Sequence, residues 1–337
     1  MPVLPIAPSP SQPGYLALLL SFALAFLVLV VMLKGGWARF ALDHPNPRSL
    51  HVAPVPRTGG VALMVGVSAG WIMLQPGLWL LLAVAMVLFA TSLWDDVRGL
   101  PVVWRFLAHF LAAWVLVVFY FLPGLELVGT AMAVLAIVWM TNLYNFMDGS
   151  DGLAGGMALF GFGFYGLAAW LHGDAAFAGL CWSVAAASLA FLLFNFHPAR
   201  IFMGDSGSIP LGFLAATFGL LGWHAEYWPL WFPALVFSPF ILDASVTLAK
   251  RLLRGEKVWQ AHREHYYQRL VQMGWGHRQT ALAEYALMAV AGASATWAIA
   301  QDGRTQLAFG IVWGLAYLLA MWLVDTKWSR MQRPSRC

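Results

Sequence analysis

Charge is scarce in this sequence: Asp, Glu, Lys and Arg make up only 10% of its 337 residues. An ordinary soluble domain carries about 25%. Hydrophobic residues make up 61%, which excludes a water-soluble monomer. Cysteine is almost absent, and the two present, Cys181 in an apolar run and Cys337 at the terminus, offer no paired framework for a disulfide scaffold. The net charge of +4 reflects membrane topology and anionic lipids, so nucleic acid is not expected as a partner.

Long apolar runs recur along the whole sequence, and each is long enough to cross roughly 30 Å of hydrocarbon as a helix. The pattern predicts an all-α, polytopic integral membrane protein with about eleven transmembrane helices. The expected spans are 15–33, 59–75, 77–94, 105–122, 127–146, 152–171, 175–195, 208–222, 229–250, 279–300 and 306–324. No repeat or linker divides the chain, so residues 1–337 are expected to form a single transmembrane catalytic domain. The longest polar stretch, 250–278, is expected to be a cytoplasmic loop that contributes to the active site.

The basic residues indicate the orientation. If the amino terminus is outside, 18 of the 19 Lys and Arg residues fall on one side, and only Arg304 lies opposite. The positive-inside rule makes that side cytoplasmic, together with the carboxyl terminus. Six carboxylates lie at or near the same ends of the spans: Asp95, Asp96, Asp148, Asp151, Asp205 and Asp243.

Three segments that contain these carboxylates could carry chemistry. Asp95 and Asp96 end a span, where two anions oppose the helix dipole unless a metal, a basic loop or a shared proton compensates them; a solvated helix end is the simpler alternative. The segment 142–156 holds two amides, two carboxylates and four glycines, and polar groups at the membrane boundary are costly without partners. Asp151 would serve as an N-cap there. In the segment 194–208, Gly204 to Ser208 resembles a backbone nest for oxyanions, and Asp205 offers an oxygen ligand for Mg²⁺.

The loop segment 261–269 holds two histidines among basic residues. If it is helical, His262 and His265 share one face at i, i+3 spacing. Zinc is a weak alternative because no cysteine or clear third ligand accompanies them. Contacts with phosphate or sugar fit the basic surroundings better.

Together these segments resemble the polyprenyl-phosphate N-acetylhexosamine-1-phosphate transferases, glycosyltransferase family 4. The histidine loop is most similar to the O-antigen-initiating branch. One departure is Thr58-Gly59-Gly60, where relatives commonly carry a third glycine. The likeness covers most of the chain and rests on Pro45 to His51, Pro56 to Gly60, Asp95-Asp96, Asn145 to Gly156, Phe202 to Ser208 and Val258 to His265.

The resemblance implies a reaction at the cytoplasmic surface of the bacterial inner membrane. Undecaprenyl phosphate would attack the β-phosphorus of a UDP-N-acetylhexosamine, which would release UMP and leave undecaprenyl-diphospho-sugar in the bilayer. Phosphoryl transfer between two anionic substrates needs Mg²⁺, cationic side chains and positioning. The expected cofactor is Mg²⁺, with Mn²⁺ as the alternative ion. Bilayer lipids are further expected partners, and a homodimer is left open.

The resemblance also implies roles for individual residues. Asp205 and Asn145 would bind the metal. Asp95 would be the base or orienter of the lipid phosphate, assisted by Asp96. The expected substrate-binding residues are Asp148, Asp151, Asn142, Arg48, His51, Arg57, Arg105, Gly204, Ser206, His262, Arg263 and His265.

A rival class is an ion-coupled transporter or lipid flippase, because acids within a membrane often mark coupling sites. Transporters bind near the midplane, whereas these acids gather at one interface. A structural scaffold would give no reason for the aligned acids. The sequence leaves open which hexosamine is used, which polysaccharide is built, and whether the mechanism has one step or two.

Overall fold

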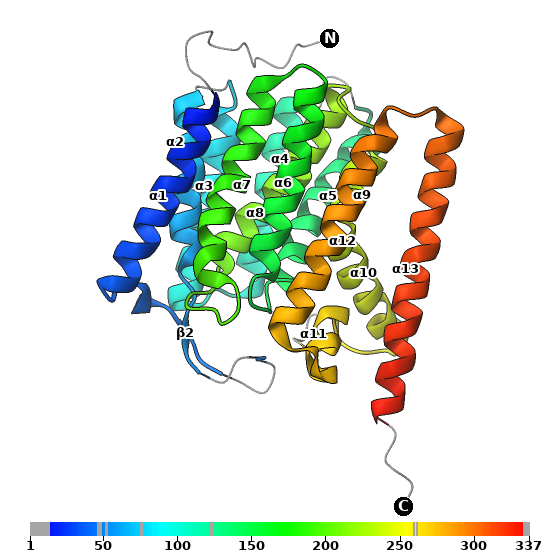
Figure 1. The fold of residues 1–337 in the computed structure, drawn as a ribbon. Coiled ribbons are helices and arrows are strands. Elements are labelled where there is room, and N and C mark those ends of the chain that lie inside the picture. Colours follow the sequence, from blue (N-terminus) through cyan, green and yellow to red (C-terminus); the bar gives the residue numbers. More distant parts are fainter. Residues whose placement is uncertain are drawn as a thin grey trace, which may run out of the picture.

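The computed structural model describes residues 14–45, 49–50, 53–74, 77–121, 125–258, 260 and 262–332. These residues form a bundle of roughly parallel helices (Figure 1), and their only strands are the short antiparallel pair β1 (Leu42–Asp43) and β2 (Val55–Pro56). The expected all-α membrane architecture is confirmed. Nine helical segments of the described chain are long and apolar enough to cross a membrane, with α11 and α12 counted as one.

The helices follow the expected order of spans. Their bounds are α1 Gly14–Lys34, the 3₁₀ helix η1 Trp37–Phe40, α2 Gly59–Leu74, α3 Trp79–Arg98, α4 Val102–Tyr120, α5 Leu127–Phe146, α6 Leu153–Leu171, α7 Ala175–Asn195, α8 Asp205–His224, α9 Trp231–Val236, α10 Ser238–Leu253, α11 Tyr266–Leu270, the π-helical turn η3 Val271–Trp275, α12 Gly276–Ile299 and α13 Gly303–Gln332.

Two expected spans differ from the prediction. The second, α2, has only 16 residues. The ninth, 229–250, is divided into α9 and α10 at Phe237, and Pro239 stands in the first turn of α10. Proline has no N–H to donate and its ring clashes with the preceding turn, so it is tolerated at a helix start but interrupts a continuous helix. The segment 250–278 is also less open than expected, because α11 and η3, with the end of α10 and the start of α12, take up more than half of it.

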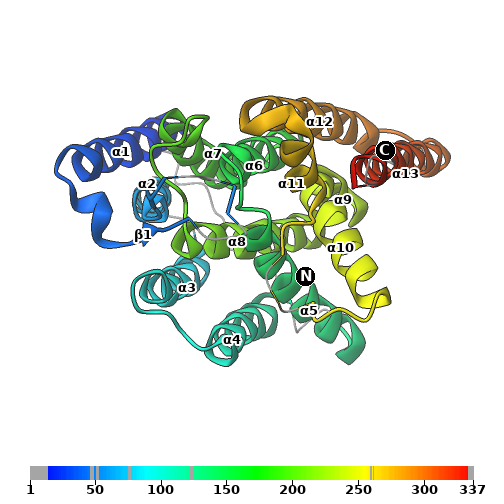
Figure 2. The same ribbon diagram turned by 90° about the horizontal axis from the view of Figure 1, so that it is seen from below.

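Helix α8 forms the centre of the bundle. Viewed from below, it lies between one row formed by α1, α7, α6 and α12 and another formed by α3, α4 and α5 (Figure 2). In its most apolar stretch, 83% of the residues are buried, against 6% for α13 at the edge. Small residues permit this packing: a Cβ added at Gly212 would lie 2.7 Å from the Tyr144 Cβ of α5.

The polar ends of the helices meet at one end of the bundle. Figure 1 places the β1–β2 pair and α11 at this end, beside the last turns of α1 and α13. Hydrogen bonds across the bundle connect the end of α7 to the start of α6, where Asn195 Oδ1 accepts from the Gly152 N–H at 3.0 Å. The convergence of the acidic ends that the sequence predicts is therefore present in the fold.

Which side of a membrane this end faces stays a prediction. We expect a cysteine at the exposed Lys257, in a Cys337→Ser background, to resist an impermeant thiol reagent in intact cells and to react after permeabilisation. Cys181 is buried and should not interfere. A cysteine at Ala175, the exposed first residue of α7 at the opposite end of the bundle, is the control and should react in intact cells. The reverse pattern would place the polar end outside.

Candidate active site

The centre of the polar end is an ion cluster of three helices. Arg105 in the first turn of α4 places Nη1 3.0 Å from Asp95 Oδ2 of α3 and 3.7 Å from Asp205 Oδ2 of α8. Asp95 Oδ1 also accepts the Leu100 N–H at 2.5 Å. One cation is thus shared between two carboxylates that are far apart in sequence. Asp95 is therefore not the isolated, solvated helix end that the simpler interpretation requires.

Asp96 has a different surrounding from its neighbour. Its two carboxylate oxygens accept the backbone N–H groups of Asp205, at 3.1 Å, and Ser206, at 2.9 Å. These are first-turn donors of α8, which lack partners within the helix. Asp96 of α3 thus caps α8 from another helix. Arg57, which follows β2, donates to the Asp96 backbone carbonyl at 2.6 Å and so connects the end of β2 to α3. The bond between Asp96 and the Ser206 N–H therefore helps to hold α3 and α8 together at the site.

Asn145 orients Asp205. Its Nδ2 donates to Asp205 Oδ1 at 2.8 Å and to Ser208 Oγ at 2.9 Å. The amide nitrogen therefore faces the carboxylate, and ligation of a metal through the amide oxygen stays a prediction. Gly204 has a positive φ of 71°, and a Cβ there would lie 2.3 Å from the Arg57 carbonyl oxygen. Only glycine fits this close approach.

Asp148 adds a further carboxyl group beside this cluster. It follows the end of α5 and is half-buried. Burial raises the pKa of the Asp148 carboxyl well above its usual range, and the carboxylates of Asp205 and Asp96 raise it further. A cation bound at this end would relieve that repulsion.

Asp151 is not the N-cap that the sequence suggests, because the cap position of α6 is Gly152 and no side chain caps the helix. Instead, Asp151 Oδ2 lies 2.6 Å from His197 Nδ1 and accepts the Ala199 N–H at 3.2 Å. His277 of α12 stacks on His197, with ring centroids 5.5 Å apart. Sequence reasoning missed both histidines. Neither histidine is close to Asp151 in the sequence, and only the folded chain brings both of them to this carboxylate.

The histidine loop is held by Asp243, not by helical spacing. Asp243 is buried, lies 3.1 Å from His265 Nδ1, and accepts the N–H groups of Tyr266 and Tyr267 at 2.8 and 2.9 Å. His265 precedes α11 as its N-cap, so residues 262–265 are not helical and the condition for a shared helical face is not met. The rings are nevertheless neighbours, with centroids 4.7 Å apart. Burial, with the nearby His265 and Arg251, lowers the pKa of His262 to about 4, so the ring is neutral at pH 7.

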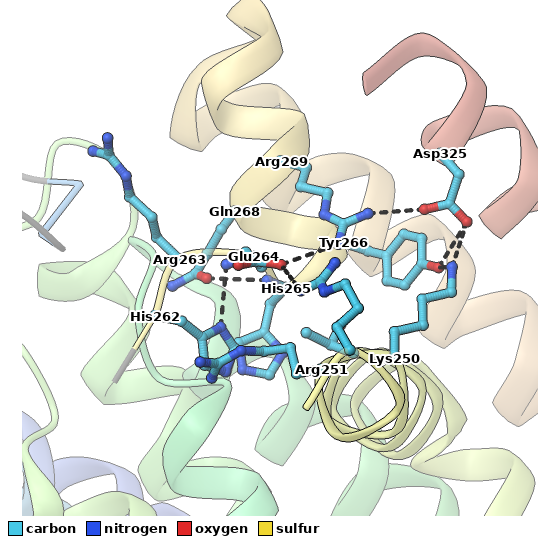
Figure 3. Close-up of polar contacts among 12 residues, drawn as sticks. Lys250, Arg251, His262, Arg263, Glu264, His265, Tyr266, Gln268, Arg269 and Asp325 are labelled. Carbon is cyan, nitrogen blue, oxygen red and sulfur yellow. Dashed lines mark hydrogen bonds and ion pairs between the residues drawn. The ribbon is translucent and has the colours of Figure 1, made fainter. Parts of the chain in front are cut away.

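A polar network fixes α11 to its neighbours (Figure 3). Asp325 of α13 accepts from Lys250 of α10 at 2.5 Å and from Arg269 of α11 at 2.8 Å. Tyr266 donates to the same carboxylate at 3.2 Å. The Arg263 side chain extends away from this network (Figure 3). The loop is thereby anchored on one side, while the side that carries Arg263 is exposed.

Tyr267 connects the histidine loop to the acidic cluster. Its hydroxyl donates to the Phe146 carbonyl at 3.4 Å and would lie 2.2 Å from a Cβ at Gly149. The loop therefore lies against the connection that carries Asp148.

Two expected substrate-binding residues, Arg48 and His51, lie outside the described residues. Asn142 is buried within α5, where its Nδ2 donates to the Val138 carbonyl at 2.7 Å.

The side chains present suit a hard divalent cation. No group of three or more His, Cys, Asp or Glu that could hold a metal occurs in the described part of the chain, which gives the zinc alternative no support. Mg²⁺ needs only one or two carboxylates together with substrate phosphates and water. Asp205, with Asp95 and the Ser208 hydroxyl nearby, supplies oxygen donors of that kind.

Fold and site together define a polytopic membrane protein in which carboxylates and cationic side chains from separate helices meet at one end of the bundle. The family model described as glycosyl transferase family 4 matches residues 78–222. This match and the relatives described next support the family of polyprenyl-phosphate hexosamine-1-phosphate transferases.

Three relatives show how the similarity is distributed. A Bacillus subtilis protein named probable undecaprenyl-phosphate N-acetylglucosaminyl 1-phosphate transferase is 29% identical over 73% of this chain and 74% of its own length. The decaprenyl-phosphate N-acetylglucosaminephosphotransferase of Mycolicibacterium smegmatis is 28% identical over 87% of this chain and 86% of its own. A phospho-N-acetylmuramoyl-pentapeptide-transferase of Levilactobacillus brevis is 32% identical, over 44% of this chain and 45% of its own. All three are named as transferases, so the transporter alternative gains no support from them.

Proposed function

We propose that this protein transfers N-acetylhexosamine-1-phosphate from a UDP-sugar to undecaprenyl phosphate as the initiating step of O-antigen or related cell-envelope polysaccharide synthesis. The observation that carries the proposal is the Asp95–Arg105–Asp205 cluster with Asn145 beside it. Relatives named for sugar-phosphate transfer to a polyprenyl phosphate support the reaction class. The similarity of the histidine loop to that of the O-antigen-initiating branch supports the proposed role in O-antigen synthesis.

In the proposed reaction, an oxygen of the lipid phosphate forms a bond to the β-phosphorus of the donor. The bond from that phosphorus to the bridging oxygen breaks, and UMP leaves with the electron pair. Such transfer depends on positioning and on stabilising charge on the phosphoryl oxygens. Bound Mg²⁺ would neutralise part of that charge. Asp205 would hold the ion, and Asn145 would keep the carboxylate oriented.

Arg105 and Asp95 would act on the acceptor. The Arg105 guanidinium can contact phosphate oxygens in a bidentate manner while Asp95 holds it in place. Asp148 and the histidine loop would bind the donor, with His262 as a neutral hydrogen-bonding group and Arg263 as an exposed cation. We place this site at the cytoplasmic face of the bacterial inner membrane, where nucleotide sugars would be supplied.

The direct test uses purified protein in detergent with undecaprenyl phosphate, Mg²⁺ and a panel of UDP-sugars that includes UDP-GlcNAc and 6-deoxy N-acetylhexosamines. We expect UMP release with one donor and a lipid product whose mass equals undecaprenyl phosphate plus that sugar phosphate. The matched control omits the lipid and should release no UMP. Release without a lipid product, or no release with any donor, would contradict the proposal.

The histidine loop gives a separate prediction. We expect His262→Ala to raise the KM for the UDP-sugar about tenfold, because one hydrogen bond to a charged phosphate would be lost. His265→Ala should weaken donor use and also lower the thermal stability, because His265 is a buried partner of Asp243. Kinetics and thermal melts of both variants separate the two effects. Activity that follows the zinc content would contradict this assignment.

A further inference from the structure

Two histidines beside Asp151 have no role in the proposed reaction. His197 follows α7, and His277 is the second residue of α12. The two rings stack on each other, but the His277 side chain is only 14% exposed, against 40% for His197. The polar atoms of a largely buried ring need hydrogen-bond partners. The partners of the two His277 nitrogens therefore show what this ring holds in place.

The His277 ring joins two segments that are distant in the sequence. Its Nε2 lies 3.3 Å from the Leu50 carbonyl oxygen, and its Nδ1 lies 2.8 Å from Ser150 Oγ and 3.4 Å from the Asp151 backbone nitrogen. A carbonyl only accepts and a backbone N–H only donates, so the ring proton is on Nε2 and Nδ1 is the acceptor. One neutral tautomer satisfies all three contacts. The start of α12 is thereby bound to residues 49–50 and to the connection between α5 and α6.

The chain before α12 is shaped to bring His277 to this place. Gly274 and Gly276 have positive φ values of 96° and 67°, which residues with a Cβ rarely adopt. The stretch from α11 to the start of α12 passes over residues 146–151 and contacts them twice. Tyr267 donates to the carbonyl of the last residue of α5, and His277 contacts the segment four residues further on. The segment that carries Asp148 is therefore held at both ends by one stretch of chain.

His197 holds the Asp151 carboxylate from the other side. The Oδ2 atom of Asp151 lies 2.6 Å from His197 Nδ1. The second oxygen, Oδ1, lies 3.8 Å from His277 Nδ1, which is beyond hydrogen-bond distance. His277 thus fixes the backbone of Asp151 while His197 fixes one carboxylate oxygen, and neither ring uses the other oxygen.

We propose that His277 is a positioning residue of the UDP-sugar site, which holds Ser150 and Asp151 so that Asp151 Oδ1 faces the nucleotide sugar. This inference rests on the proposed function and on the assignment of Asp151 to substrate binding. His277 does not itself touch the substrate, because both of its nitrogens are occupied by groups of the protein. Leu50 lies between Arg48 and His51 in the sequence, so the same ring aligns two segments that are expected to bind substrate. Small displacements of such groups are costly to binding and turnover.

The test uses the full chain in detergent with undecaprenyl phosphate and the UDP-sugar that the wild type uses, and it measures UMP affinity by calorimetry. His277→Ala should raise the KM for the UDP-sugar and the Kd for UMP about tenfold each, because the hydrogen bonds that fix Asp151 are lost. The kcat and the KM for undecaprenyl phosphate should change less than about twofold. Gln279→Ala, at an exposed position of α12, is the matched control and should leave all of these values unchanged.

Two conservative variants separate the contacts of the ring. His277→Asn keeps an acceptor near the position of Nδ1 and should recover most of the UMP affinity. His277→Gln keeps a donor near the position of Nε2, which serves only the Leu50 carbonyl, and should recover little. A role limited to stability would show itself in the melting temperature and would not divide the two variants in UMP affinity.

Ser150→Ala tests the same contact from the other partner. It removes the hydroxyl that donates to His277 Nδ1 and should raise the Kd for UMP about threefold. The double variant Ser150→Ala/His277→Ala should bind UMP no more weakly than His277→Ala alone, because the two side chains act through one hydrogen bond.

The outcomes distinguish this inference from the proposed function. A wild type that makes the lipid product, with an unchanged Kd for UMP in both His277→Ala and Ser150→Ala, would overturn the positioning role and leave the proposed function standing. A fall in kcat alone, or equal recovery by Asn and Gln, would overturn it as well. If His277→Ala does not fold, Ser150→Ala decides: a weaker UMP affinity supports the role and an unchanged affinity overturns it. A wild type that makes no lipid product would overturn the proposed function and this inference with it.

Discussion

Asp205→Ala is expected to abolish Mg²⁺-dependent transfer, a loss of about three decades in turnover, at the upper end of the range found when one group that stabilises transition-state charge is removed. We propose Asp205 as the carboxylate that would hold Mg²⁺, since Asn145 orients one oxygen and Arg105 lies 3.7 Å from the other. Added Mg²⁺ should not restore activity, because the missing group is a ligand and not the ion.

The measurement is a Mg²⁺ titration of purified Asp205→Ala beside Asp148→Ala. Asp148 is another carboxyl group next to the cluster, and we expect its alanine variant chiefly to raise the KM for the nucleotide sugar while keeping Mg²⁺ dependence. The capping of α8 uses the backbone N–H of Asp205 and is retained in the variant. A thermal melt near that of the wild type would show this. Unchanged activity and metal dependence in Asp205→Ala would remove Asp205 from the site.

Asp95→Asn should lower turnover by at least about two decades, with normal insertion and expression. The substitution keeps the volume and leaves an oxygen to accept the Leu100 N–H, but it removes the charge that holds Arg105 at 3.0 Å. Arg105 would then pair with Asp205 alone and lose its position for the acceptor phosphate. Initial rates at saturating substrates measure this effect.

The matched variant is Asp96→Asn, one residue further along α3. Asp96 binds two backbone N–H groups of α8, so its variant should lose thermal stability as well as activity. A melting temperature that falls only for Asp96→Asn would separate the two roles. Wild-type turnover in Asp95→Asn would instead leave Asp95 as a helix end with no part in the reaction.

Hydrophobicity alone could predict the membrane fold, because each span needs about 20 consecutive apolar residues and such runs are visible without any contact information. The convergence of Asp95, Asn145 and Asp205 was also predictable. Spans alternate in direction, so chain segments between alternate pairs of spans must reach the same end of the bundle. The break of the ninth span at Phe237 was signalled only by Pro239.

The sequence by itself therefore determined the membrane class, the family motifs and the end of the bundle at which the polar residues gather. Only the tertiary structure decided what each residue contacts. Asp95 and Asp96 are adjacent in sequence, yet one pairs with Arg105 and the other caps α8. Adjacent helical residues point in directions about 100° apart, so their partners come from different helices. Contacts of that kind depend on packing between distant segments and leave no local pattern in the sequence.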